Sequence, residues 1–460
     1  ATLNTVTEEW SFVGVSMAYA TVQNPDGSIH YFTYSGSTPW PTSAWQGSGN
    51  NAVYNAVDFG LVSGTDQSQT QRAANVAAIQ NAVDAAIALI DENTGGGTVV
   101  IPAGTYELGG TTGGLPATIT MDGVTGGLTI RGESAGTTLM QYGTPPSGTG
   151  SYLAADIFYV TNSGSPNNWG IRFRDLFFRY DQGLSGTGAA IDLEGGVAFT
   201  AAEDCGFLDC PQALFTSSED PVDGILRCGL INCWVNQTKY GSSTQITLNG
   251  PECFVINCNI ALSATLSDCT GIAIMGSSLA VGCQIYGCHI SAFSTGISID
   301  SGHDIYITDC QIDDDEIGLI IQPAGTGKTY GVYVSSTTFQ APTSPQVQAS
   351  GVVIDTNGTG VIEGVFLRDC MSYGFENAGV NIVSGKAITI SGGKYSSNGS
   401  SPLTPSLGAG IAVTGAASQV RIIGADCSGV YDFVGTTQPY GVAVSGSPSG
   451  ATQKRPAVAT

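Results

Sequence analysis

Short apolar strands recur along the middle of the chain, and each follows a glycine. Gly296–Ile299 reads GISI and Gly351–Ile354 reads GVVI. The same phrase recurs at Gly271, Gly318 and Gly410. Apolar residues at every second position, or in a short run, are typical of β-strands. These stretches therefore predict successive strands of one repeating structure.

A cysteine marks the same place in successive repeats. The anchors stand at intervals of 28, 25, 30 and 22 residues, and they are Cys205, Cys233, Cys258, Cys288 and Cys310. The residues directly before them are short and polar, or glycine: Asp204, Asn232, Asn257, Gly287 and Asp309. Such residues tolerate a left-handed backbone conformation and hold sharp bends. Repeats of uneven length around a shared turn predict a solenoid whose loops vary.

The polar turn column beside an apolar column resembles the right-handed parallel β-helices of the pectate-lyase superfamily. In that superfamily an asparagine ladder lines one corner, and aliphatic residues stack inside. The resemblance covers about residues 95 to 430. It implies an all-β fold, a right-handed parallel β-helix. It implies no single activity, because this fold carries lyases, hydrolases, epimerases, fructotransferases and viral spikes such as phage tailspikes.

The segment from residue 66 to 92 has a different period. Ala74, Val76, Ile79 and Val83 stand at helical spacing, and a glycine run at 95–97 ends the pattern. In the resembling superfamily such a helix caps the N-terminal end of the coil, which would otherwise expose strand edges and core. We therefore divide the chain into a β-rich preamble (1–55), a capping α-helix segment (56–94), the parallel β-helix (95–430) and a C-terminal tail (431–460).

Composition and charge limit the kinds of partner that the protein is expected to bind. The chain has 64 glycines and only 11% charged residues, which suits short strands and tight turns. Its 37 acidic and 14 basic residues give a net charge of -23, which repels nucleic acid and anionic membranes. No apolar run is long enough to span a bilayer. We expect no nucleic-acid partner and no membrane span, and an extracellular (secreted) or virion-surface location.

The twelve cysteines allow two structural interpretations. Neighbouring coils lie ~4.8 Å apart, so a cysteine column either stacks as buried free thiols or forms disulfides between coils. We favour free thiols. Aligned cysteines do not converge on a tetrahedron, so we expect no metal site in this column.

One outward column carries candidate chemistry. Aligning the strands after the turn places these residues in it: Asp192, Asn249, Met275, Asp300, Gln322 and Asp355. Asp300 and Asp355 then lie two coils apart, roughly 9 to 10 Å. That distance is near the ~6.5 to 9.5 Å between the carboxyl groups of inverting glycosidases, which leave room for a water molecule.

The densest acidic run, Asp313-Asp314-Asp315-Glu316, precedes the strand at Gly318. Crowded carboxylates raise one another's pKa, which keeps a general acid protonated near neutral pH. His303 and Asp304 follow Asp300 and are expected on the same face. The predicted catalytic residues are Asp300, His303, Asp313, Asp314, Asp315 and Glu316, and the predicted substrate contacts beside them are Asp304, Gln322 and Asp355.

Two other interpretations of the acidic run remain open, a calcium-ion site and a solvated surface turn. The phrase DDDEIGLII also resembles the paired-aspartate motif of polygalacturonases. That resemblance implies Asp314 and Asp315 as the acid and the water-activating base.

A second constellation combines aromatic and acidic residues. Tyr180 and Asp181 form a short run with Arg179, and Trp169 and Trp234 are assigned to nearby coils together with Asp192 and Glu194. Aromatic rings that stack on sugar faces beside carboxylates suit a glycan-binding groove. We therefore expect Trp169, Tyr180, Asp181, Asp192, Glu194 and Trp234 to contact substrate.

These features together predict a polysaccharide-degrading glycoside hydrolase that acts on a neutral or weakly acidic glycan through paired carboxylates. One alternative is a virion or cell-surface spike that binds a glycan, with or without cleaving it, and for which a homotrimer is the expected assembly. A polysaccharide lyase, a fructotransferase and a purely structural adhesin are further alternatives. No cofactor is expected apart from the calcium ion considered above.

Overall fold

The computed structural model describes part of the chain and divides it into two compact units, residues 1–46 and 47–460. The described residues are 18–23, 29–34, 52–88, 90, 97–109, 111–112, 115–116, 118–124, 126–134, 136–142, 152–153, 156–162, 168–181, 184–185, 188–217, 224–238, 243–263, 268–275, 280–323, 325–341, 349–396, 409–414, 416–427, 442–445 and 452–453. In the first unit, strand β1 (Ala18–Gln23) pairs antiparallel with β2 (Ile29–Tyr34).

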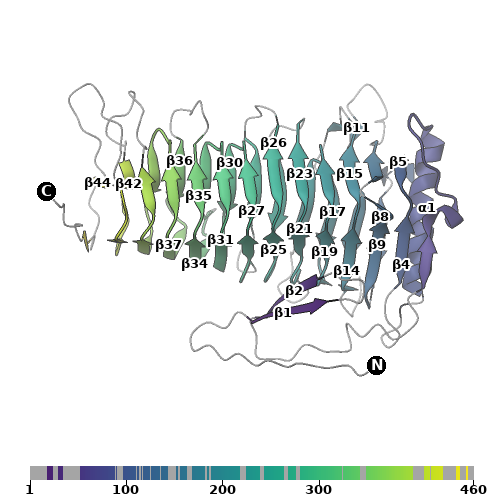
Figure 1. Ribbon diagram of the computed structural model, residues 1–460, viewed down its shortest axis with the longest axis horizontal. Coiled ribbons are helices and arrows are strands. Elements are labelled where there is room, and N and C mark those ends of the chain that lie inside the picture. The colour runs from purple at the N-terminus through teal and green to yellow at the C-terminus, as the bar shows by residue number, and fades with distance from the viewer. Residues whose placement is uncertain are drawn as a thin grey trace. The chain divides into compact units, whose positions relative to one another are not determined.

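The second unit is a coil in which each turn adds one strand to each of three parallel sheets. From β19 to β40, each strand pairs in parallel with the strand three places further along, as β22 does with β25 and β23 with β26. Figure 1 shows these coils stacked along the long axis of the unit. Crossovers between parallel strands of one sheet are almost always right-handed. The fold is the predicted right-handed parallel β-helix.

In the described part of the chain, the largest sheet has 14 strands. They are β3 (Val53–Asn55), β4 (Thr98–Ile101), β9 (Leu128–Gly132), β14 (Ile171–Arg174), β19 (Ala201–Glu203), β22 (Gly229–Ile231), β25 (Phe254–Ile256), β28 (Gln284–Tyr286), β31 (Gly302–Thr308), β34 (Lys328–Ser335), β37 (Val361–Arg368), β40 (Lys386–Ser391), β43 (Arg421–Ile423) and β45 (Thr452–Gln453).

The second sheet follows it around each coil and has 11 strands among the described residues. They are β5 (Gly104–Leu108), β10 (Thr137–Gln141), β15 (Phe177–Tyr180), β20 (Gly206–Leu208), β23 (Trp234–Gln237), β26 (Asn259–Leu262), β29 (His289–Ser291), β32 (Gln311–Asp313), β35 (Thr338–Gln340), β38 (Met371–Tyr373) and β41 (Lys394–Ser396).

The third sheet completes each coil, with 12 strands in the described ranges. They are β8 (Ile119–Asp122), β12 (Phe158–Thr161), β17 (Ala189–Glu194), β21 (Gln212–Ser217), β24 (Thr244–Leu248), β27 (Thr270–Ile274), β30 (Thr295–Ile299), β33 (Ile317–Ile321), β36 (Ser350–Ile354), β39 (Ala378–Ile382), β42 (Ala409–Thr414) and β44 (Val442–Ser445). Two-residue strands form three small pairs: β6 (Thr111–Thr112) with β7 (Leu115–Pro116), β11 (Tyr152–Leu153) with β16 (Leu184–Ser185), and β13 (Asn168–Trp169) with β18 (Val197–Ala198).

The coil extends beyond the boundaries expected from the sequence. β3 lies within the expected preamble and pairs with β4. β44 and β45 lie within the expected tail and pair with β42 and β43. The solenoid therefore includes, at both ends, short strands whose apolar pattern is too brief to be recognised in the sequence.

Stacked inward side chains form the core of the coil. On the 12-stranded sheet, fully buried aliphatic residues in register run through Ile246, Ile272, Ile297, Leu319, Val352 and Val380. The cysteine anchors are buried free thiols, as we predicted. The Cys233 thiol donates to the carbonyl of Ala202 at 3.4 Å, and the Cys258 sulfur accepts the backbone N–H of Cys233 at 3.4 Å. Buried thiols therefore pack as small apolar groups and also satisfy backbone atoms.

The turn between the 14-stranded and 11-stranded sheets has the predicted left-handed conformation. Asp204, Asn232, Asn257 and Asp309 have φ between 52° and 54°. A second left-handed column, which the sequence pattern does not reveal, lies where the chain enters the 14-stranded sheet. It includes Phe199, Arg227, Glu252 and Asp304, with φ between 54° and 57°.

The capping helix is α1 (Gln69–Ala88), inside the predicted range, and a short 3₁₀-helix, η2 (Ala56–Phe59), precedes it. Figure 1 shows α1 at the end of the stack, against the first coil. Val76, Ile79 and Val83 are buried there. The helix and the coil approach closely at Gly97, because a Cβ at this position would lie 2.9 Å from the Cβ of Ala86.

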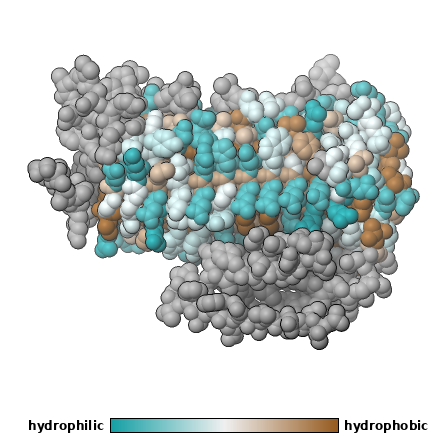
Figure 2. All heavy atoms as spheres, viewed as in Figure 1, coloured by the Kyte–Doolittle hydropathy of each residue, from teal (hydrophilic) through white to brown (hydrophobic). Residues whose placement is uncertain are grey.

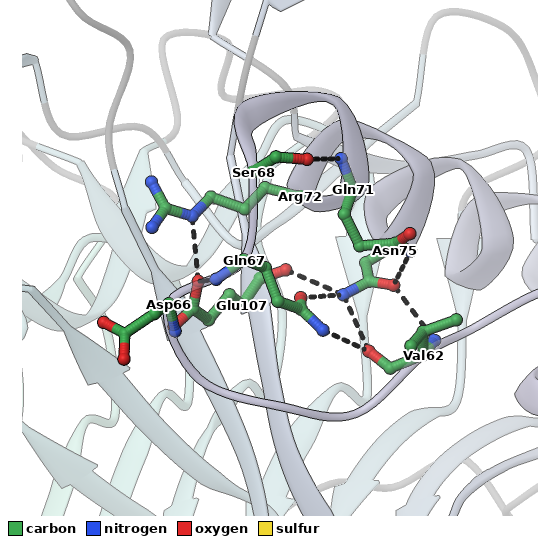
Figure 3. Close-up of polar contacts among 8 residues, drawn as sticks. All are labelled: Val62, Asp66, Gln67, Ser68, Gln71, Arg72, Asn75 and Glu107. Carbon is green, nitrogen blue, oxygen red and sulfur yellow. Dashed lines mark hydrogen bonds and ion pairs between the residues drawn. The ribbon is translucent and has the colours of Figure 1, made fainter.

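A buried carboxylate joins the cap to the first coil (Figure 3). Glu107 of β5 accepts hydrogen bonds from the backbone N–H of Asp66 at 2.6 Å, that of Gln67 at 2.8 Å, and Nε of Arg72 at 2.9 Å. Asn75 of α1 donates to the Glu107 carbonyl at 3.0 Å. The cap therefore depends on polar contacts as well as on its apolar face.

Candidate functional site

The outer face of the 12-stranded sheet carries most of the predicted column. Strand register and backbone hydrogen bonds align Asn249, Met275, Asp300, Gln322 and Asp355 in successive coils, directly after strands β24, β27, β30, β33 and β36. We call these five residues the edge row. Asp300 and Asp355 are two coils apart, as predicted.

The predicted alignment is wrong at one member of the column. Asp192 pairs with Phe215, and Phe215 pairs with Thr247, so Asp192 lies one outward position before the edge row. Glu194, two residues later on β17, extends the edge row instead. β17 begins in register with β21 and β24 and runs one residue longer than the five-residue strands further along, so Glu194 still belongs to the strand and Asp192 lies two residues before the edge row.

Asp192 and Glu194 belong to a cluster of titratable side chains on two neighbouring strands. Tyr159 of β12 pairs with Asp192 in the sheet, and its hydroxyl donates a short hydrogen bond to the Glu194 carboxylate. Asp156 lies just before β12 and accepts the backbone N–H of Ala189 at 2.7 Å. Asp192 is half-buried, and its Oδ1 is buried without a hydrogen-bond partner.

The surroundings shift the proton affinities within this cluster. Burial, followed by the negative charges of Asp156 and Glu194, raises the pKa of Asp192 to about 7. Burial and the hydrogen bond to Glu194 raise the pKa of Tyr159 to about 12. Burial also raises the pKa of Asp156, although the Ala189 N–H acts in the opposite direction. Asp192 is therefore partly protonated at neutral pH, which suits a proton donor.

The described strands of this sheet differ in charge from those of the 14-stranded sheet. None of the strands of the 12-stranded sheet, within the bounds given above, contains Lys or Arg. The 14-stranded sheet, by contrast, carries Arg172 and Arg174, which both pair with Glu203. A polyanion would therefore meet only acidic and neutral side chains on the strands of the 12-stranded sheet.

Asp300 and Asp355 lie further along the edge row. Burial raises the pKa of Asp300, and the hydrogen bond from the Ser298 hydroxyl acts in the opposite direction. Asp355 accepts hydrogen bonds from the Ser384 hydroxyl at 3.0 Å and the Asn357 N–H at 3.1 Å. Gln322 occupies the coil between them.

The acidic run at 313–316 does not form one surface. Asp313 faces outward from the 11-stranded sheet, whereas Asp314 turns the corner with φ of 57°. Asp315 is fully buried, and its carboxylate accepts the backbone N–H of Phe293. It lies in register with Phe293, which follows a left-handed residue in the preceding coil. The corner changes the phase of the side-chain alternation, so adjacent aspartates point in different directions.

This placement corrects the predicted catalytic group. Asp315 has no access to a polysaccharide, so the structure does not support the acid–base pair implied by the polygalacturonase motif. Asp300 ends a strand of the 12-stranded sheet, and Glu316 precedes the start of the next. A five-residue strand is about 16 Å long. Asp300 and the 313–316 run therefore lie at opposite ends of the strands of that sheet.

His303 and Asp304 also face away from the 12-stranded sheet. Both lie in β31 of the 14-stranded sheet, where His303 pairs with Tyr330. The His303 Nδ1 lies 3.6 Å from the Asp304 carboxylate, and both side chains are exposed. They form a pair on the surface of the 14-stranded sheet, which follows Asp300 in the chain after a turn.

The predicted aromatic contacts separate as well. Tyr180 is fully buried, and its hydroxyl donates to the carbonyl of Ala189 at 2.7 Å, so it is part of the core. Asp181 lies just after β15, where its N–H bonds the carbonyl of Gln141. Trp234 is exposed on the 11-stranded sheet, away from Asp192. The Trp169 side chain lies outside the described residues.

Sequence reasoning missed the pair of His289 and Asp313. On the 11-stranded sheet, His289 Nε2 lies 2.9 Å from Asp313 Oδ1. A signal for this surface was present, because the residue directly after each cysteine anchor faces outward on this sheet. That rule places Trp234, Asn259, His289 and Gln311 in one row.

No group of three His, Cys, Asp or Glu side chains within the described ranges is arranged to hold a metal ion. None of the helices in the described part of the chain combines the length and hydrophobicity that a membrane span needs.

The fold places the chain among parallel β-helix proteins. No protein-family model matches it, and no curated protein matches it in sequence. Among solved structures, it resembles the ORF18 protein of Geobacillus virus E2 with a TM-score of 0.42 and 13% identity, over 88% of this chain and 66% of that one. The chain thus spans just under two thirds of the virus protein.

Two further solved structures show a comparable likeness. PfbA, a surface adhesin of Streptococcus pneumoniae, has a TM-score of 0.46 and 12% identity, over 86% of this chain and 93% of that one. An iota-carrageenase complexed to iota-carrageenan fragments has a TM-score of 0.45 and 11% identity, over 89% and 95%. At such identities the likeness concerns the fold alone.

Proposed function

We propose that the protein binds a polysaccharide on the outer face of the 12-stranded sheet and hydrolyses it at Asp192 and Glu194. The observation that carries this proposal is a pair of carboxyl groups on one strand, Glu194 and the half-buried Asp192, whose Oδ1 is buried without a hydrogen-bond partner and whose pKa burial raises to about 7. Glycoside hydrolysis needs this combination, one group that is protonated and one that is ionised.

In the proposed reaction Asp192 is the general acid and protonates the glycosidic oxygen as the bond to the leaving sugar breaks. Glu194 is the second carboxyl group, and the Tyr159 hydroxyl, which donates a hydrogen bond to it, orients it. Two residues that face outward on one strand are two positions apart, so their Cα atoms are separated by about 6.6 Å. We propose that Glu194 activates a water molecule held between the carboxyls, as in inverting glycosidases.

The charges around the cluster define the substrate. Without Lys or Arg on the described strands of this sheet, a polyuronate or a sulfated glycan would find no counter-charge. We therefore propose a neutral or weakly acidic glycan. Asp300, Gln322 and Asp355 are the proposed substrate contacts further along the edge row. A secreted or virion-surface location remains a prediction. A homotrimer also remains a prediction, and light scattering of the purified chain tests it.

The hydrolysis test measures reducing ends released from dextran, laminarin, galactomannan and polygalacturonate. Asp192→Asn and Glu194→Gln are each expected to lower kcat about 10²- to 10⁴-fold, the usual loss when a general acid or base is removed. Glu363→Gln is the matched control, since this exposed carboxylate lies on the 14-stranded sheet and pairs with Lys386 at 2.9 Å. It is expected to leave kcat unchanged.

Other outcomes would change the assignment. Full activity of Asp192→Asn would refute the site, and products that absorb in the near ultraviolet would show elimination in place of hydrolysis. Binding without any release of reducing ends would support a glycan-binding spike or adhesin.

A further inference from the structure

A second outward surface lies on the 11-stranded sheet, on a different side of the coil from the proposed hydrolytic cluster. Its first row follows the cysteine anchors and their equivalents, and comprises Trp234, Asn259, His289, Gln311, Thr338 and Met371. Its second row is two residues further along each strand, and comprises Asn236, Ala261, Ser291, Asp313, Gln340 and Tyr373. We call these twelve residues the amide face.

Hydrogen bonds between side chains hold the amide face in place. Asp313 accepts from Gln311 Nε2 at 2.7 Å and lies 2.9 Å from His289 Nε2. The Tyr373 hydroxyl donates to Gln340 Oε1 at 2.7 Å. The Ser263 hydroxyl likewise donates to Asn236 Oδ1 at 2.7 Å. With their oxygens engaged, the amide groups of Asn236 and Gln340 present N–H donors to a ligand.

Aromatic side chains stand at both ends of the amide face. Trp234 is 38% exposed and Tyr373 is 36% exposed. The indole stacks on Phe177 at 6.1 Å between ring centroids, across the strand that carries Gly206. A Cβ at Gly206 would lie 2.4 Å from the Phe177 ring, so the glycine makes this stacking possible. Phe177 therefore holds the indole in a defined orientation.

Charge complementarity selects a neutral ligand. Among the twelve positions the only acidic or basic side chains are Asp313 and its partner His289. The other members are amides, hydroxyls, aromatic rings and small or apolar groups. Amides and hydroxyls match the hydroxyl groups of sugars, and aromatic rings pack against the apolar faces of sugars.

The shape of the surface suits a polymer. Its strands lie ~4.8 Å apart, so the six strands from β23 to β38 extend over about 24 Å along the coil. Figure 2 shows hydrophilic residues in rows along the length of this unit, with paler and brown bands between them. A polymer that lies along the coil would meet side chains at equivalent positions in successive coils.

The aromatic residues of the 14-stranded sheet do not offer the same surface. Tyr306, Tyr333 and Phe366 stack with centroids 5.1 Å apart and interplanar angles of 12° and 3°. Tyr333 therefore has both faces covered by neighbouring rings. A sugar ring needs an open aromatic face, so this central ring stabilises the coil without offering a platform.

We propose that the amide face binds a neutral polysaccharide along the axis of the coil, as a site separate from the hydrolytic cluster. This binding does not depend on the proposed hydrolysis, because the two surfaces belong to different sheets. Such a site would keep the enzyme on a long polymer while cleavage takes place elsewhere.

The test is affinity electrophoresis in native gels that contain dextran, laminarin, galactomannan or polygalacturonate. All chains carry Asp192→Asn, so that the polymer stays intact. At least one neutral polysaccharide is expected to retard this parent chain, and polygalacturonate is not. Trp234→Ala and Gln311→Ala are each expected to reduce that retardation. The dissociation constant for the polysaccharide, obtained from the dependence of mobility on polymer concentration, is expected to rise about tenfold, equivalent to 1.4 kcal/mol. Tyr286→Ala, which removes a ring that is 42% exposed on the 14-stranded sheet, is the control.

The outcomes separate the two proposals. The amide-face proposal is overturned if no neutral polysaccharide retards the parent chain, or if Trp234→Ala retains full retardation. Where Trp234→Ala does not fold, as judged by circular dichroism, the exposed Gln311→Ala decides the question. Hydrolysis of short oligosaccharides is measured separately, in chains that keep Asp192, and reports on the hydrolytic cluster, so loss of hydrolytic activity and loss of polymer binding are read independently.

Discussion

Replacing Glu107 with glutamine is expected to loosen the capping helix. The carboxylate is fully buried and accepts two backbone N–H groups and the Arg72 guanidinium. Glutamine keeps one acceptor oxygen but turns a donor NH2 group towards these donors. Removing one partner of a buried ion pair costs about 3 to 5 kcal/mol. The Arg72 side chain is partly exposed, which places the expected cost at the lower end. We expect a loss of about 3 kcal/mol for opening of the cap.

The pH dependence has a definite sign. Burial alone would raise the pKa of Glu107, but hydrogen bonds from Arg72, Gln67, Tyr142 and Asp66 bring it below its ordinary value of 4.5. A group with a lowered folded-state pKa stabilises the protein above the unfolded-state value and loses this effect as pH falls through the folded-state value. The difference between the wild type and Glu107→Gln is therefore largest at neutral pH and shrinks in acid.

Amide hydrogen exchange of α1 and β5 measures this opening locally. A loss of 3 kcal/mol corresponds to about a hundredfold faster exchange. Asp84→Asn, which removes an exposed carboxylate from the same helix, is the control and is expected to change exchange little. Equal protection of α1 in Glu107→Gln and Asp84→Asn at pH 7 would refute the reasoning.

Two further predictions concern other carboxyl groups. Burial raises the pKa of Asp315 well above 3.8, so its contribution to stability is full below 3.8 and is lost as pH rises towards the folded-state pKa. Asp315→Asn is expected to remove this slope and to stabilise the protein at pH 8 in urea titrations, whereas an unchanged slope would show that Asp315 is ionised in the fold. Because the pKa of Asp192 is about 7, kcat is expected to fall about tenfold per pH unit above that value. A rate that stays constant to pH 9 would exclude Asp192 as the general acid.

The proposed hydrolytic cluster and the amide face have opposite electrostatic characters. Asp192, Glu194 and Asp156 crowd negative charge on the 12-stranded sheet, which suits a proton-transfer site. The amide face pairs its one carboxylate with His289. Catalysis needs perturbed proton affinity, whereas extended binding of a neutral polymer needs many weak, uncharged contacts. The coil separates these requirements by assigning them to different sheets.

The sequence by itself determined the repeating architecture. Alternating apolar residues specify strands, and polar or glycine residues before Cys233, Cys258 and Cys288 specify the left-handed turn, because both depend on local backbone preference. The helical spacing before residue 90 specified the cap for the same reason. The edge row from Asn249 to Asp355 also followed from the sequence, since residues at equal distance from equivalent turns stack in register.

Only the tertiary structure decided which side chains on either side of a corner, or in coils of unequal length, share a surface. A residue with positive φ changes the phase of the alternation at each corner, so Asp313 faces outward while Asp315 enters the core. Tyr180 is also buried in the core, although the residues on either side of it in the sequence are polar. The contact between Tyr159 and Glu194 joins residues 35 positions apart. Contacts of this kind depend on how coils of unequal length stack, which no local pattern encodes.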